Sequence, residues 1–155
     1  GGHLTGFRTM MTGEMFALLG ETSILRHTVV AGDWSDGDFT DAVAEAHGAA
    51  GEVPAKLFGL RAGPLLFGDE APCGAARLSG LLIGAEIAIG MAGHDAPLCL
   101  VANGGMAERY AAALTSLGIG FEMADSEAAV RAGLFAAAAR IWPDRGFQTT
   151  TPATP

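Results

Sequence analysis

The chain has 155 residues, of which 50% are hydrophobic and 17% charged, and its formal net charge is −8. That length suits one domain with a hydrophobic core, and that apolar share excludes an intrinsically disordered chain. Acidic residues outnumber basic ones and no Lys/Arg cluster occurs, which argues against nucleic acid or an anionic membrane as a partner.

Residues 81–92 form the longest apolar stretch, which Glu86 interrupts and which is shorter than the ~20 residues of a membrane span. We interpret it as a buried helix and predict no membrane insertion. Cys73 and Cys99 lack CxxC spacing and the four histidines are scattered singly, so no protein-bound metal is predicted. Reduced cysteines of this kind are typical of a cytoplasmic protein.

A strand followed by a helix is predicted at the start of the chain. Residues 5–11 have the composition of a strand, and Thr12 fits the N-cap of a helix that Gly20 would end. Glu14 then stands in the first turn, where its charge favours the helix dipole. The residues alone leave open whether this turn only caps the helix or also faces a ligand.

Helices are also predicted for the middle of the chain. The Gly, Asp, Trp and Ser residues of 31–37 indicate a loop, after which Asp38 or Thr40 begins a helix. Two pieces that each begin with proline, residues 54–63 and 64–74, predict short helices packed on a neighbouring layer. The region shows no linker and no repeat, which favours a single domain.

A buried helix is predicted over residues 80–92, with Ser79 as its cap. Its sequence, GLLIGAEIAIGMA, is apolar nearly all round. Glu86 lies within it, and burying a carboxylate is costly unless it is hydrogen-bonded. We therefore expect a structural partner for Glu86, such as a backbone N–H.

The last third of the chain has the pattern strand, helix, strand, helix. These elements are expected at residues 98–102, 106–117, 119–124 and 126–142. Gly118 occupies the position of a C-terminal helix cap, and Pro143 stops the last helix. Four apolar residues recur at helical spacing along that helix: Val130, Leu134, Ala137 and Ile141. Parallel pairing of the two strands is the default for this order.

Asn103-Gly104-Gly105 follows the first of these strands at its carboxyl end, where parallel α/β units bind ligands. Two glycines there admit a flat ring or a phosphate, and they suit an ordinary tight turn equally well. Together with Asp125 they match a dinucleotide fingerprint in part, although Glu108 stands where its third glycine belongs. A dinucleotide fold and an actin-like kinase fold both compete for this element.

Five stretches, in order, resemble the C-terminal half of 2-dehydro-3-deoxygalactonokinases. They are FRTMMTGEMFALL, LFGLRAGPLLFG, RLSGLLIGAEIA, LVANGGMAERYAAALTSLGIGFEMAD and AGLFAAAARIW. The resemblance runs from about Phe7 to about Ile141. The pieces MTGE and SGLLIGAEI are its most distinctive parts.

The resemblance implies a helix-rich α/β fold, the C-terminal lobe of an actin-like (ribonuclease-H-like) sugar kinase. It implies a nucleotide-side lobe over residues 1–145 and a disordered tail over residues 146–155. The implied reaction, in galactonate breakdown, is phosphoryl transfer from ATP to the 6-hydroxyl of 2-dehydro-3-deoxy-D-galactonate, with Mg²⁺ as cofactor.

The resemblance also implies ligand-facing residues in three places. The nucleotide-binding residues it implies are Asn103, Gly104, Gly105 and Gly133. Thr12, Gly13 and Glu14 match a strand-to-helix turn facing the cleft, and Ser79 and Gly80 match a helix start near it. A helix-packing role for Gly133 and a capping role for Thr12 stay open beside these.

In this family an N-terminal half carries a phosphate loop of the Asp-x-Gly-x-Thr type, a motif that this sequence lacks. We therefore expect that half as a partner, assign no catalytic residue here, and expect Mg²⁺ to be held by the nucleotide phosphates and that half. The lone chain is expected to be inactive and to form a homodimer through uncovered apolar surface. A stand-alone nucleotide-binding or regulatory module, or a small dinucleotide-binding protein, are the alternatives.

Overall fold

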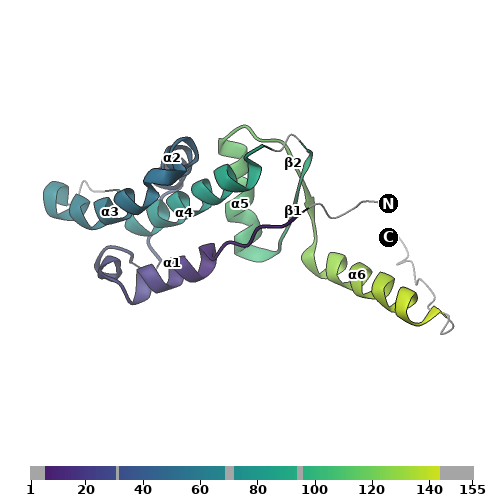
Figure 1. Ribbon diagram of the computed structural model, residues 1–155. Helices are drawn as coiled ribbons and strands as arrows, with labels where there is room; N and C mark the ends of the chain where they lie inside the picture. Colours follow the sequence, from purple (N-terminus) through teal and green to yellow (C-terminus); the bar gives the residue numbers. More distant parts are fainter. Residues whose placement is uncertain (1–5, 31, 69–71, 94–95, 144–155) are drawn as a thin grey trace, which may run out of the picture.

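The computed structural model describes residues 6–30, 32–68, 72–93 and 96–143. Their elements are α1 (Thr12–Glu21), η1 (Ile24–His27), α2 (Asp36–Gly48), η2 (Ala50–Glu52), α3 (Val53–Phe67), α4 (Gly74–Met91), β1 (Leu98–Val101), α5 (Gly104–Ser116), β2 (Phe121–Ala124) and α6 (Ser126–Ile141). Helices α1 to α4 form one block, α5 connects it to the strands, and α6 extends away from both (Figure 1). The fold is helix-rich α/β.

Helix α4 lies at the centre of the packed block, as its all-round apolar sequence predicts. By length and composition it could cross a membrane, but 67% of it is buried inside the molecule, as in the core helix of a globular domain. The helix begins at Gly74, because the Cys73 N–H before it donates to the Asp38 carboxylate, 2.8 Å away. The prediction that Ser79 and Gly80 start this helix is therefore wrong, since both lie inside it.

Two glycines of α4 let α2 approach closely. A Cβ on Gly80 would lie 2.7 Å from Ala42 Cβ, and one on Gly84 would lie 2.9 Å from Val43 Cα. Carbon atoms in ordinary contact are about 3.5–4.0 Å apart, so neither position has room for a side chain. Gly80 is therefore a helix-packing glycine that faces α2.

The two strands pair in parallel, as predicted, with Leu98 opposite Phe121. Both side chains pack, together with α5, against the buried face formed by α2 and α4. Strand β1 ends at Val101, so the Asn103-Gly104-Gly105 turn does lie at its carboxyl end.

Helix α5 ends as its sequence predicts. Gly118 adopts a φ of +68°, and its N–H donates to the Thr115 carbonyl at 3.0 Å. The Ile119 N–H donates to the Leu114 carbonyl at 2.9 Å, which completes a Schellman motif.

The start of the chain differs from the prediction in two ways. Residues 6–11 form no strand, and the sheet of the described residues consists of β1 and β2 alone, so their backbone lacks the partner that a strand requires. Arg8 and Met10 line a cavity of about 270 Å³ together with residues of β1. Phe7 is 83% exposed. Helix α1 begins at Thr12 itself, with Met11 at the N-cap and no side-chain cap.

The middle of the chain differs in its boundaries. Helix α2 begins at Asp36 because the Ser35 hydroxyl accepts the Asp38 N–H at 3.2 Å. The two predicted short helices are one, α3, which continues through Pro64. A proline removes one intrahelical hydrogen bond and strains the preceding turn, but it does not end this helix.

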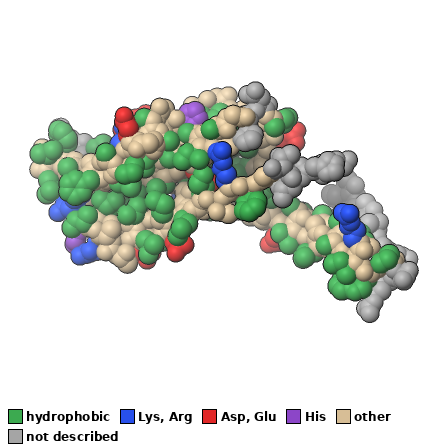
Figure 2. Space-filling view, viewed as in Figure 1, with side chains coloured by type: hydrophobic (Ala, Val, Ile, Leu, Met, Phe, Trp, Pro, Cys, Tyr) green, Lys and Arg blue, Asp and Glu red, His purple; other side chains and the backbone are tan. Residues whose placement is uncertain are grey.

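Two apolar surfaces are uncovered within the described residues. On α3, Leu66 is 73% exposed, and Phe58, Leu65 and Phe67 lie beside it in the same state. On α6, Leu134 is 67% exposed, and no residue of that helix is buried. Apolar side chains gather at both ends of the molecule in Figure 2. The predicted tail, residues 146–155, lies outside the described residues.

Candidate functional site

Three cavities meet at Arg109, a residue in the second turn of α5. One, of about 370 Å³, is lined by α1, by the segment before α2 and by Arg109. A second, also about 370 Å³, lies between the start of α2 and the start of α5. The third, of about 210 Å³, lies between the start of α1, the middle of α4 and α5. No pattern in the sequence singles out Arg109, because a single arginine on a helix is ordinary.

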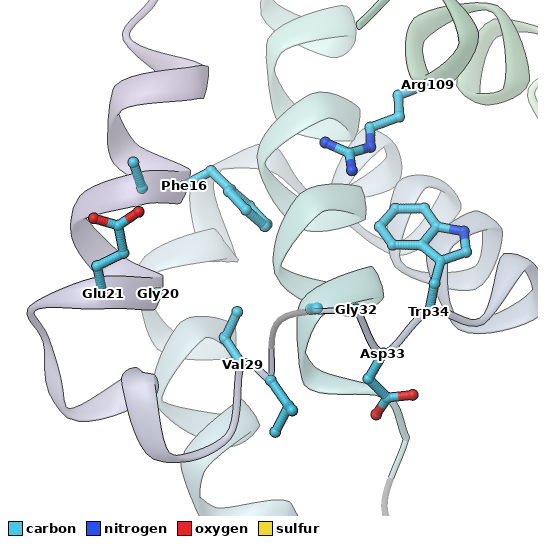
Figure 3. A pocket seen from close by; sticks show the side chains of 11 residues that line it. Phe16, Gly20, Glu21, Val29, Gly32, Asp33, Trp34 and Arg109 are labelled. Carbon is cyan, nitrogen blue, oxygen red and sulfur yellow. The ribbon is translucent and has the colours of Figure 1, made fainter. Parts of the chain in front are cut away.

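Trp34 holds the Arg109 guanidinium in place. The guanidinium carbon lies 4.9 Å from the centre of the Trp34 ring, a cation–π distance. The Trp34 indole N–H donates to the Asp36 carboxylate at 2.7 Å, and its ring lies 5.3 Å from that of Phe39. Figure 3 shows the guanidinium pointing into the space between Phe16 and Trp34. Arg109 therefore presents a fixed cation to the cavities.

The third cavity brings together residues predicted from two distant parts of the sequence. Thr12 and Gly13 line it from the start of α1, and Ser79 lines it from the middle of α4. Ser79 is buried and its hydroxyl has no hydrogen-bond partner among the described residues. Gly80, its neighbour in the sequence, points the other way, toward α2.

Glu86 connects three helices on the far side of Thr12. Its carboxylate accepts hydrogen bonds from the Thr12 hydroxyl and, at 2.7 Å, from the Tyr110 hydroxyl. The predicted structural partner thus exists, but it is a pair of hydroxyls from α1 and α5 instead of a backbone N–H. Burial, and after it the Glu86 carboxylate, raise the pKa of Tyr110. The Thr12 side chain therefore links α1 to α4 by a hydrogen bond and does not cap α1.

The Asn103-Gly104-Gly105 turn opens α5. Gly104 has a φ of +60°, a region that L side chains rarely adopt, and a Cβ on Gly104 or Gly105 would meet no atom within 4 Å. Gly105 lines the cavity between α2 and α5. The Asn103 amide oxygen accepts the Ser126 N–H at 3.1 Å, so Asn103 fastens the start of α6. This hydrogen bond gives Asn103 a structural role. It does not cover the backbone of Gly104 and Gly105.

Three other predicted residues stand apart from the cavities at Arg109. Gly133 lies mid-way along α6, where a Cβ would meet no atom within 4 Å, so it is not a packing glycine in this arrangement. Glu14 is in the first turn of α1, as predicted, but lines none of the three cavities. Asp125, the acid of the dinucleotide alternative, accepts the Ala128 N–H at 2.7 Å and caps α6.

Comparison with known proteins identifies the family. The sequence profile described as 2-keto-3-deoxy-galactonokinase matches residues 1–137. The chain belongs to the 2-keto-3-deoxy-galactonokinase family. A relative from Rhizobium meliloti, described as a probable 2-dehydro-3-deoxygalactonokinase, is 43% identical over 143 residues, which cover 89% of this chain and 47% of that protein.

A crystal structure from the same family has the same fold. It is of a Sinorhizobium meliloti protein provisionally described as a 2-dehydro-3-deoxygalactonokinase, with a TM-score of 0.78 and 44% identity. The match covers 92% of this chain and 49% of that one. The chain therefore spans about half the length of the galactonokinase-family proteins that it matches.

Proposed function

We propose that this chain forms the nucleotide-side lobe of an ATP-dependent 2-dehydro-3-deoxygalactonokinase, an actin-like sugar kinase that phosphorylates the 6-hydroxyl of 2-dehydro-3-deoxy-D-galactonate. The observation that carries the proposal is the family match over residues 1–137. The shared position of Thr12, Gly13, Ser79 and Gly105 around Arg109 supports it, because residues far apart in the sequence line one connected set of cavities. We propose the cytoplasm as its location.

The first turn of α5 suits a nucleotide. Its N-cap, Asn103, makes no side-chain hydrogen bond to the helix, so the first N–H groups are available as donors. Gly104 and Gly105 leave open space above that turn, and Trp34 with Phe39 offers aromatic surface in the cavity beside Gly105. In this proposal Asn103, Gly104, Gly105 and Gly133 border the nucleotide.

Magnesium fits these residues less well. Within the described ranges, no group of three or more His, Cys, Asp or Glu side chains is placed to hold a metal ion. We therefore propose that Mg²⁺ is bound mainly by the nucleotide phosphates and by the remainder of the kinase. When bound, the ion would neutralise charge on the transferring phosphoryl group.

The matched relatives are about twice as long as this chain, and we propose that the remainder of such a protein supplies most of the sugar pocket and the catalytic base. Closure of two lobes would then exclude water from the transferring phosphate. The chain by itself is expected to bind nucleotide without transferring phosphate.

A coupled kinase assay tests this division. The chain is assayed with ATP, Mg²⁺ and 2-dehydro-3-deoxy-D-galactonate, first alone and then mixed with a separately produced N-terminal half from the same family. Phosphorylation only in the mixture is the expected result. Turnover by the lone chain would contradict the proposed division, and a mixture that stays inactive although both parts are folded would remove the kinase assignment.

A stand-alone nucleotide-binding module is the second candidate. It is favoured by the open turn at Gly104 and Gly105, which needs no other half to accept a ligand. ATP affinity measured by calorimetry, together with an inactive mixture in the assay above, would support this module. The dinucleotide alternative stays the least favoured candidate, because one oxygen of the Asp125 carboxylate that would bind the ribose already caps α6.

We also propose that the lone chain self-associates. The apolar side chains of α3 and α6 are exposed in the single chain, and contiguous apolar surface of this kind favours association. A homodimer would cover one of the two surfaces.

A further inference from the structure

The cavity between α1, α4 and α5 is lined by a serine whose hydroxyl makes no hydrogen bond within the described residues. This serine, Ser79, is only 4% exposed. The Ser79 oxygen is not fully enclosed, since Thr28 Oγ1 is the one wholly buried side-chain atom without a partner among the described residues. A hydroxyl on a cavity wall that no protein group uses is available to donate to a ligand.

Arg109 supplies the only charge on the wall of this cavity. The other lining residues are Thr12, Gly13, Phe16, Ser79, Leu82, Ile83 and Met106, all of them uncharged. Across the described residues, no carboxylate lies within ion-pair distance of Arg109. Four carboxylates, on Glu21, Asp33, Asp36 and Glu108, line the two neighbouring cavities instead. An anion is thus best accommodated in the smallest of the three.

Trp34 and α1 prepare the cavity for an anion. The cation–π contact with Trp34, at 4.9 Å from the ring centre, restrains the Arg109 side chain, so less side-chain freedom is lost on binding. Thr12 and Gly13 line the cavity and belong to the first turn of α1. The N-cap of this helix makes no side-chain hydrogen bond. Free N–H groups at a helix N-terminus favour negative charge. The Thr12 hydroxyl faces Glu86, outside this cavity.

We infer that the cavity lined by Ser79 and Arg109 binds an anionic group of the kinase substrates, either a phosphate of the nucleotide or the carboxylate of the sugar acid. The Arg109 guanidinium and the Ser79 hydroxyl donate to its oxygens. This inference rests on the proposed function, since it names residues that would hold the charged part of a substrate of that enzyme. Both sources present the same chemistry, two or three oxygens sharing negative charge.

The test compares four probes on the full chain by calorimetry. The probes are adenosine, ATP, inorganic tripolyphosphate and 2-dehydro-3-deoxy-D-galactonate. The variants are Arg109→Gln, Arg109→Lys and Ser79→Ala. Arg131→Gln is the matched charge control, because Arg131 is exposed on α6 and pairs only with Glu127 among the described residues. The thermal midpoint of each variant is measured first, and Arg109→Lys retains the cation if Arg109→Gln fails to fold.

We expect Arg109→Gln to weaken binding of the anionic probe by about tenfold or more. Ser79→Ala should weaken it by about threefold to tenfold. These losses are typical of charged and neutral hydrogen bonds. Arg109→Lys should lose less affinity than Arg109→Gln, and the affinity of Arg131→Gln should equal that of the wild type. Ser79→Ala should not lower the thermal midpoint, because its hydroxyl has no protein partner to lose. A drop in that midpoint without a change in affinity would give Ser79 a structural role and overturn the inference.

The probes separate the two anion sources. Weaker binding of ATP and tripolyphosphate with unchanged adenosine affinity supports a phosphate in the cavity, whereas weaker binding of the sugar acid alone supports its carboxylate. Equal affinities of wild type and variants for every anion overturn the inference, and wild-type binding of adenosine would then leave the proposed function standing. An effect on tripolyphosphate without any adenosine binding would support the anion site and count against the proposed nucleotide lobe.

Discussion

Adding one methyl group at Gly80 tests the packing on which the fold depends. In Gly80→Ala the new Cβ would lie 2.7 Å from Ala42 Cβ and 3.1 Å from the Val43 backbone nitrogen. Because α2 and α4 contact each other along their length, the methyl group cannot be accommodated without separating them. The helix backbone at Gly80 itself needs no glycine, since its φ is not positive.

Two opposing effects set the magnitude. Alanine favours a helix over glycine by about 1 kcal/mol. Overpacking a well-packed core costs typically about 1–3 kcal/mol and sometimes more, and here a backbone carbonyl, that of Phe39, is among the clashing atoms. We expect a net loss of about 2 kcal/mol, which for a chain of this size lowers the melting temperature by about 4–8 °C.

The assay is urea and thermal unfolding followed by far-ultraviolet circular dichroism. Gly90→Ala is the matched control, because Gly90 lies in the same helix and its Cβ would meet no atom within 4 Å. The control should gain up to about 1 kcal/mol from helix propensity. If Gly80→Ala unfolds at the same urea concentration as Gly90→Ala, the close approach of α2 and α4 is not present in solution.

Three further predictions concern charge and assembly. Tyr110 is the only tyrosine in the chain, so absorbance titration reports it alone. Its raised pKa should keep it un-ionised above the ordinary value of about 10; unfolding should restore ionisation near that value, and Glu86→Gln should restore it in part, because burial is the larger cause. The hydrogen bond from Lys56 lowers the pKa of Glu45 in the folded state, so its stabilisation should be present above the ordinary value of 4.5 and disappear as the pH falls below it. The stability difference between wild type and Glu45→Gln, about 0.5–1 kcal/mol at neutral pH, should vanish in acid, and a difference independent of pH would contradict this. Light scattering at high concentration should show a dimer, with Leu66→Gln shifting it toward monomer if α3 forms the contact; a wild-type monomer would refute self-association.

The periodic parts of the sequence predicted their own structure well. Leu98 to Val101 and Phe121 to Ala124 are short apolar runs bounded by turn residues, and they form the parallel pair expected. Gly118 and Pro143 marked the ends of α5 and α6 within a residue or two. These signals are local, since a cap or a run of apolar residues acts through its neighbours in the chain.

Predictions about helix starts failed where a distant residue decided them. Cys73 begins α4 because Asp38, far away in the sequence, accepts its N–H. Thr12 matches an N-cap by residue type, yet its hydroxyl donates to Glu86 on another helix. Residue type shows that a hydroxyl or a carboxylate can bond, and only the folded chain shows to which partner.

The sequence by itself determined the family, the helix-rich α/β class, the buried helix and the glycine turn after β1, because each depends on residue order or on local periodicity. Only the tertiary structure decided that Gly80 packs while its neighbour Ser79 lines a cavity, since adjacent residues on a helix point about 100° apart and their surroundings come from other helices. It also decided that Arg109, stacked on Trp34, is the cation common to all three cavities. That role depends on the packing of α1, α2, α4 and α5, which no single stretch of the sequence encodes.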